Sequence, residues 1–267
     1  MANPKVIVLT GYGINCEEET AFAFDKAGAK SEIVHINDLI DGVKNLKDYQ
    51  ILAIPGGFSF GDDTGSGNAY ANKLKNNLKE QILDFVKRQT LILGICNGCQ
   101  ILSLTGLIPA TFGKYGEPQV AFRHNSTARY ECRFVDVKAN SEKCVFTRGL
   151  DVLHIPIAHG EGNFYAENST LERLEENQQI PLKYSYSHGD LANGEFPINP
   201  NGALLDTAAV CDESGRIMGM MPHPERAIFF TQSDLWTLEK EMRLRSGKEL
   251  AEVGDGLAIF KNAVGWF

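Results

Sequence analysis

The sequence predicts an α/β fold in which a mostly parallel central sheet carries helices on both faces, together with a smaller β-rich portion. Two patterns support this prediction. Apolar strand-like runs alternate with helix-like stretches through roughly the first hundred residues, and short β-rich segments take over after Pro109. Because parallel strands need long crossover connections, which helices usually supply, the alternation indicates functional residues at the carboxyl ends of parallel strands.

The first half of the chain opens with a buried strand over residues 5–10 and a glycine-containing loop over 11–14. Asn15 can cap the helix that follows, and Gly28 lies where a helix of that length ends. Further strands are expected at 31–36, 50–54 and 91–95, with helices that end near Arg88 and Leu104.

The second half is expected to contain short strands, a turn and two helices, and no linker divides it from the first. We therefore predict one domain over residues 1–267. The expected strands cover 129–138, 152–156, 182–186, 208–211 and 217–221, the turn covers 199–202, and the helices cover 233–245 and 256–264.

The composition is that of an ordinary globular protein, with 43% hydrophobic and 22% charged residues among 267. The net charge of -8, without a cluster of Lys and Arg, argues against a nucleic-acid partner. No apolar run approaches the roughly 18 residues of a membrane span, and the N-terminus lacks the pattern of a signal peptide. Six cysteines in such a chain indicate reduced thiols, so we expect a cytoplasmic protein without a membrane partner.

Cys96 is the strongest candidate for a reactive group. It lies in Gly94–Gly98, a Gly-x-Cys-x-Gly segment that directly follows the apolar run 90–93. This spacing is typical of a nucleophile on a sharp turn between a strand and a helix, where the helix N-terminus favours the thiolate. A free cysteine is more often a small buried hydrophobe, but the glycines on both sides favour the nucleophile here.

A nucleophilic cysteine needs a base, and His223 is the leading candidate. It follows the last expected strand, and Glu225 lies two residues later, where its carboxylate can hold one imidazole nitrogen and leave the other for the Cys96 sulfur. Among the other histidines only His159, between Ala158 and Gly160, competes for this role.

A third segment, residues 55–62, contains Pro-Gly-Gly directly after an expected strand. Backbone N–H groups of such a loop can point into a site without obstruction by side chains. One of them, together with the N–H of Asn97, would form an oxyanion hole. A glycine-rich turn without chemistry is the plain alternative, and the segment lacks the patterns of phosphate-binding loops.

These three segments, in this order, resemble the class I glutamine amidotransferases. The closer likeness is to the glutaminase subunits that serve an ATP-dependent amidine-forming step of purine biosynthesis. The segments that carry it are 56–62, 94–100, 157–162, 199–202 and 219–227.

The resemblance implies a flavodoxin-like fold and hydrolysis of L-glutamine through a Cys thioester, with ammonia delivered to a partner. It implies a large synthetase subunit and a small additional subunit as partners, with ATP and Mg²⁺ bound by the synthetase and neither a cofactor nor a metal on this chain. Because free ammonia is protonated in bulk water and is then a poor nucleophile, we also expect a channel for it and a glutaminase that is slow until the partner binds. The implied roles are nucleophile for Cys96, acid/base for His223, orienting carboxylate for Glu225, oxyanion donors for Gly57 and Asn97, and substrate contact for Gln100.

Departures from the family pattern leave alternatives open. Cys99 creates a Cys-x-x-Cys spacing with Cys96, which is compatible with a redox protein. Residues 63–65 and Lys183 also differ from the residues that the family usually has at these positions. The charged segment Ile228–Val253 is longer than in small relatives. An amidotransferase subunit of another pathway and a non-catalytic scaffold on the same fold are the remaining alternatives.

Overall fold

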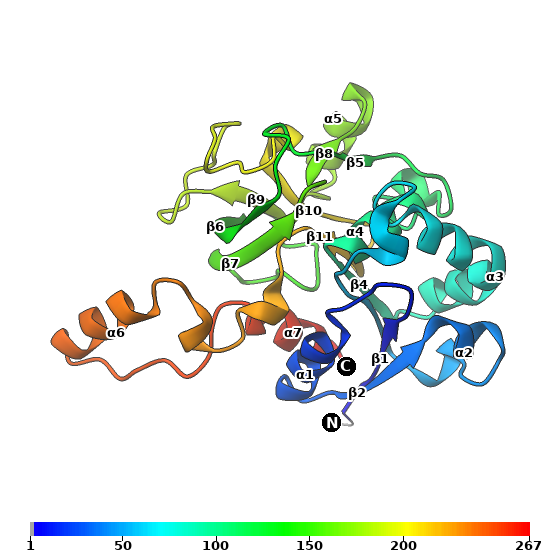
Figure 1. The fold of residues 1–267 in the computed structure, drawn as a ribbon, viewed down its shortest axis with the longest axis horizontal. Helices are drawn as coiled ribbons and strands as arrows, with labels where there is room; N and C mark the ends of the chain where they lie inside the picture. The colour runs from blue at the N-terminus through cyan, green and yellow to red at the C-terminus, as the bar shows by residue number, and fades with distance from the viewer. Residues whose placement is uncertain (1–2) are drawn as a thin grey trace.

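A nine-stranded sheet forms the centre of the protein (Figure 1), in a computed structural model that describes residues 3–267. Its strands are β1 (Lys5–Thr10), β2 (Lys30–His35), β3 (Ile51–Ile54), β4 (Leu91–Ile95), β6 (Glu131–Ala139), β7 (Val152–His159), β9 (Leu182–Ser185), β10 (Thr207–Cys211) and β11 (Ile217–Met220). Their order is β2-β1-β3-β4-β11-β10-β9-β6-β7. Two short strands, β5 (Ala121–Arg123) and β8 (Asn163–Tyr165), pair separately.

The sheet has a parallel half and an antiparallel half. Strands β2, β1, β3, β4 and β11 run parallel, whereas the pairs from β11 through β10, β9 and β6 to β7 are antiparallel. The predicted α/β class is thus confirmed, and the β-rich portion continues the same sheet. The change of direction occurs at a tight turn in which Asp212 Oδ1 accepts the N–H groups of Arg216 and Ile217, at 3.0 and 2.9 Å.

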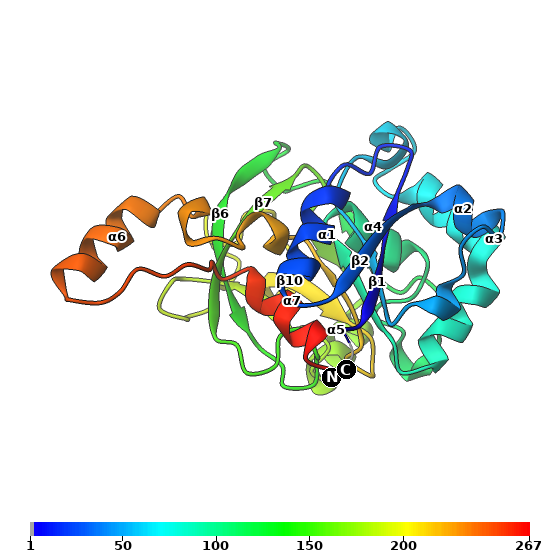
Figure 2. The same cartoon turned by 90° about the horizontal axis from the view of Figure 1, so that it is seen from below.

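Helices cover both faces of the parallel half (Figures 1 and 2). On one face α1 packs against α7, with Phe24 and Phe260 edge to face at 4.9 Å between ring centroids, and on the other α3 packs against α4. The helices are α1 (Glu17–Lys26), α2 (Ile36–Ile40), α3 (Asn68–Lys87), α4 (Asn97–Leu104), α5 (Asn168–Glu176), α6 (Trp236–Arg245) and α7 (Leu257–Val264).

Most expected elements lie within a few residues of their observed bounds, and the exceptions have physical causes. The N-cap of α1 is Cys16 and not Asn15, because the backbone N–H groups of both residues donate to Gly56 O, at 3.1 and 3.2 Å, which holds both of them ahead of the first helical turn. Helix α5 was not predicted, because its sequence is mostly polar and Leu174 is its one buried residue. The short elements α2, β5 and β8 were also missed.

Residues 228–253, here called the arm, project from the body of the protein with α6 at the far end (Figures 1 and 2). The two ends of the arm meet at its base, where Phe229 and Val253 form an antiparallel β-bridge and the N–H of Gly254 donates to Ile228 O at 3.0 Å. No helix within residues 3–267 combines the length and the apolar character that crossing a membrane requires.

Candidate active site

Three neighbouring strands bring the predicted site together. β3, β4 and β11 lie side by side and parallel, with Ile54 paired to Gly94 and Ile95 to Met220. Their carboxyl ends therefore meet at one edge of the sheet. The Pro-Gly-Gly loop follows β3, Cys96 follows β4, and the His223 segment follows β11.

Cys96 occupies a strained turn between β4 and α4. Its φ is 51° and its ψ is -105°, a conformation that costs a non-glycine residue about 1–3 kcal/mol. The flanking glycines allow the turn, since a Cβ on Gly94 would lie 2.6 Å from Gly98 O and one on Gly98 would collide with Ile54 O. The backbone N–H of Cys96 donates to Met220 O at 2.7 Å. The thiol is thus fixed at the N-terminus of α4 with 6% of the residue exposed.

His223 and Glu225 form a buried pair. Nδ1 of His223 lies 2.6 Å from Glu225 Oε1, and each residue is 1% exposed. The backbone N–H of His223 donates to Pro156 O at 2.7 Å, so β7 holds the segment in place. Nε2 of His223 has no hydrogen-bond partner among the described residues, which leaves it free for a reacting group.

The surroundings of His223 favour its protonated form. Burial by itself lowers the pKa of His223, but the Glu225 carboxylate and the nearby sulfurs of Cys96 and Cys16 outweigh it and hold the pKa well above its usual value. A protonated imidazole beside a thiol is the arrangement that stabilises a thiolate. The pair can therefore supply both an activated sulfur and a proton for a leaving group.

The Pro-Gly-Gly loop makes room for the imidazole and presents a free N–H. A Cβ on Gly56 would lie 2.7 Å from His223 Cε1, so the ring rests on this glycine. Gly57 has φ +152°, and a Cβ there would lie 2.5 Å from Gly13 O. Its N–H donates to no backbone acceptor within residues 3–267, and that of Asn97, at the start of α4, has no intrahelical acceptor. Both predicted oxyanion donors are therefore available.

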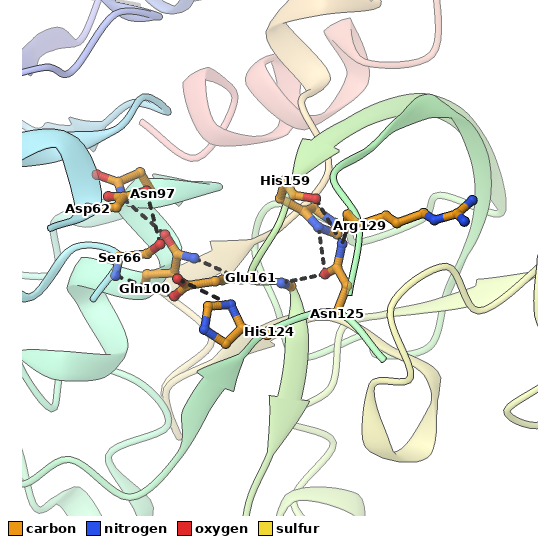
Figure 3. A network of polar contacts seen from close by, with 10 residues as sticks. Asp62, Ser66, Asn97, Gln100, His124, Asn125, Arg129, His159 and Glu161 are labelled. Carbon is orange, nitrogen blue, oxygen red and sulfur yellow. Dashed lines mark hydrogen bonds and ion pairs between the residues drawn. The ribbon is translucent and has the colours of Figure 1, made fainter. Parts of the chain in front are cut away.

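A polar network beside Cys96 occupies the side chains of Asn97 and Gln100 (Figure 3). Asn97 Nδ2 donates to Gln100 Oε1 at 3.0 Å and to Asp62 Oδ1 at 3.3 Å. Gln100 Nε2 donates to the backbone oxygen of Glu161 at 2.8 Å. Gln100, predicted to contact substrate, thus uses both ends of its amide within the protein. Burial and then the charge of Glu161 raise the pKa of Asp62, although Ser66 opposes the shift.

His159 lies next to this site but has a different chemical state from His223. Burial and the charge of His223 lower the pKa of His159 to about 3, so the imidazole is neutral. Asn125 Oδ1 lies 3.2 Å from Nδ1 of His159 (Figure 3), and since this oxygen only accepts, Nδ1 carries the proton. Nε2 is buried without a partner among the described residues. The Cys96 sulfur lies 3.7 Å from the carbonyl oxygen of Ala158, directly before His159.

Neither a dithiol nor a metal centre fits this site well. Cys99 is fully buried, and burial raises the pKa of its thiol well above the usual value, which makes it a poor partner for exchange. Cys16, His223 and Glu225 place potential ligand atoms within 4.8 Å of one another. However, Glu225 already holds His223, and Arg226 Nη2 lies 2.9 Å from the Cys16 sulfur, where it would repel a cation.

Cys16 and Arg226 were missed in the sequence, although one signal pointed to Cys16. It lies just after the glycine-containing loop at the carboxyl end of β1, at the edge of the sheet where function was expected. Arg226 follows the His223–Glu225 pair directly, but the sequence does not show where its side chain points.

The chain matches the family of CobB/CobQ-like glutamine amidotransferase domains over residues 3–267. It is 54% identical to the phosphoribosylformylglycinamidine synthase subunit PurQ of Methanococcus maripaludis, with 99% of this chain and 97% of the relative covered. It is 40% identical to the subunit of that name from Dehalococcoides mccartyi, with 100% and 98% covered. Among solved structures, a chain of PurLQS from Thermotoga maritima superposes with a TM-score of 0.71 at 27% identity, with 99% of each chain covered.

Proposed function

This chain belongs to the CobB/CobQ-like glutamine amidotransferase family, and we propose that it acts as the glutaminase subunit of a phosphoribosylformylglycinamidine synthase in purine biosynthesis. The observation that carries the proposal is the convergence, at one sheet edge, of a strained Cys96 and a buried His223–Glu225 pair beside the Gly56–Gly57 loop. This arrangement contains the parts that acyl transfer from a carboxamide needs.

In the proposed reaction the Cys96 thiolate attacks the carboxamide carbon of L-glutamine. The negative charge that develops on the carboxamide oxygen is stabilised by the N–H groups of Gly57 and Asn97, each donor typically contributing about 10²–10³ in rate. His223 gives its proton to the departing nitrogen, which leaves as ammonia, and a thioester remains on Cys96. The neutral His223 then takes a proton from water, and the hydroxide releases glutamate and restores the thiolate.

The ammonia is consumed by a partner. We propose that a PurL-like synthetase subunit, with a small PurS-like subunit, uses it for ATP-dependent conversion of the formylglycinamide ribonucleotide to its amidine. The PurLQS structure from Thermotoga maritima supports such an assembly. ATP and Mg²⁺ would bind to the synthetase and not to this chain, and the glutaminase would be slow until the synthetase is bound.

We propose a cytoplasmic location, which the proposed pathway and the cysteines support. All six, including the exposed Cys132, are free thiols, as expected in a reducing compartment.

The proposed nucleophile is tested with a diazoketone analogue of glutamine, followed by peptide mapping by mass spectrometry. We expect one adduct on Cys96, none in Cys96→Ser, and normal labelling in Cys132→Ser, which removes an exposed cysteine of β6. Labelling of Cys132 or of another residue in place of Cys96 would contradict the proposed mechanism.

A further inference from the structure

Cys16 is a second sulfur beside the predicted catalytic pair. It is completely buried at the N-terminal boundary of α1. The same glycine supports both groups, since a Cβ on Gly56 would lie 3.3 Å from the Cys16 sulfur and 2.7 Å from His223 Cε1. Potential ligand atoms of Cys16, His223 and Glu225 all lie within 4.8 Å of one another. Cys16 therefore forms part of the wall against which the imidazole rests.

The sulfur of Cys16 makes polar contacts with two neighbouring side chains. The thiol donates to Asn15 Oδ1 at 3.3 Å and accepts from Arg226 Nη2 at 2.9 Å. Nε of Arg226 lies 3.8 Å from Glu225 Oε1, the same oxygen that holds His223. The guanidinium thus links the sulfur to the carboxylate that orients the imidazole.

The backbone of Cys16 reaches the other half of the site. The N–H groups of Asn15 and Cys16 donate to Gly56 O at 3.1 and 3.2 Å. The peptide that carries this oxygen is followed by Gly57, a predicted oxyanion donor. One residue is therefore in contact with the oxyanion loop through its backbone and with the acid/base segment through its side chain.

We propose that Cys16 is a positioning residue which, with Arg226, holds the His223 imidazole against the Gly56–Gly57 loop at the spacing that glutamine hydrolysis requires. This inference rests on the proposed function, because it assigns a role toward His223 as the acid/base. Cys16 is not a second nucleophile, since it is buried and its sulfur is already bound by the guanidinium.

A change at Cys16 alters the electrostatics around His223 in a known direction. The groups that face His223 are Glu225 and Arg226 on its own segment, Cys96 from the turn between β4 and α4, His159 from β7, Tyr130 before β6, and Cys16 before α1. Burial lowers the pKa of His223, whereas Glu225, Cys96 and then Cys16 raise it. Removal of the sulfur should therefore lower the pKa of His223.

The inference is tested with Cys16→Ala and Cys16→Ser in the full chain, with Cys144→Ala as the matched control. Cys144 is an equally buried thiol that packs on Met218, outside the site. The His223 imidazole is titrated by NMR, and glutaminase rates are measured in the complex with the synthetase. For Cys16→Ala we expect kcat to fall about tenfold to hundredfold while KM for glutamine stays within about twofold.

We also expect the pKa of His223 to fall and the alkaline limb of the pH–rate profile to move to lower pH. Cys16→Ser should shift both in the same direction by less, because its hydroxyl still accepts from Arg226. Cys144→Ala should shift neither. An unchanged His223 titration in Cys16→Ala, or in Cys16→Ser if the alanine variant does not fold, would overturn the inference. If the wild-type complex showed no Cys96-dependent glutaminase activity, the proposed function would be overturned instead. The NMR titration would still decide whether Cys16 acts on His223.

Discussion

The elbow around Cys96 and the arm are opposite kinds of structure in one chain. Every residue of β4 and of the elbow Gly94–Gly98 is buried, and the backbone there is strained at Cys96. In the arm, α6 has no buried residue, and Leu238 and Met242 are 58% and 62% exposed. The elbow is shaped by its neighbours, whereas the arm keeps its shape through local hydrogen bonds and a few contacts at its base.

The two regions differ in their sensitivity to substitution. At the elbow, a single added carbon meets the backbone of another strand, so geometry and chemistry cannot be separated. In the arm the same change meets solvent. Matched substitutions, one near the elbow and one in the arm, therefore separate the two kinds of structure.

The largest effect is expected for Glu225→Gln. The amide can no longer stabilise a protonated His223, and one of its orientations would favour the wrong imidazole tautomer, so kcat should fall about 10³- to 10⁴-fold. The matched change in the arm is Glu241→Gln, which removes an exposed ion pair with Arg245 and should alter kcat less than about twofold. Steady-state glutaminase kinetics in the synthetase complex test both variants, and equal effects would contradict the comparison.

A second pair of variants compares two glycines. Gly98→Ala forces a Cβ into the carbonyl oxygen of Ile54 and should lower the free energy of unfolding by about 3 kcal/mol or more. Gly247 in the arm has φ +69°, and a Cβ added there would have no atom within 4 Å. Gly247→Ala should therefore lower the free energy of unfolding by only about 1 kcal/mol, through the backbone conformation. Urea unfolding measures both values. A Gly98→Ala variant as stable as Gly247→Ala would show that the elbow can relax.

The smallest effect concerns the base of the arm, where His154 lies 2.8 Å from both Asp136 and Asp234. Burial lowers the pKa of His154, but hydrogen bonds to Asp136 and Asp234 outweigh it and raise the pKa to about 9. Since this is above the unfolded value, the stabilisation is fully present below about pH 6.5 and is lost as the pH rises through about 9. Because the side chain of Asp234 is 54% exposed, we expect only about 1–2 kcal/mol.

The measurement is the difference in unfolding free energy between wild type and His154→Gln, followed from about pH 6 to about pH 10. The difference should shrink with rising pH. His188→Gln, which removes an exposed contact with Asp190, is the matched surface variant measured alongside it. A constant difference for His154→Gln would mean that its contribution does not depend on protonation.

Much of the parallel half could be predicted from the sequence, because its information is local. The apolar runs of β1, β3 and β4 predict buried strands, and two glycines around Cys96 predict a turn that excludes side chains. The amphipathic pattern of α5 is too polar to give the same signal, with Leu174 its one buried residue.

Other features could not be predicted because they depend on distant contacts. The sequence alone did not show that β11 pairs with β4, which brings His223 to the elbow. Nor did it show that Arg226 reaches Cys16 or that Gln100 is held by Glu161, since each contact joins segments far apart in the chain.

The residue types and the turn chemistry of the site are encoded locally in the chain: a cysteine between glycines, a histidine with a carboxylate two residues later, and a loop of two glycines. These requirements are steric and chemical, and they are met within a few residues. The neighbours of His223, and hence its charge state, depend on the folded arrangement of the whole chain. Burial, the Glu225 carboxylate and the sulfurs of Cys96 and Cys16 act over a few ångströms in space, while their positions in the chain span more than half of its length.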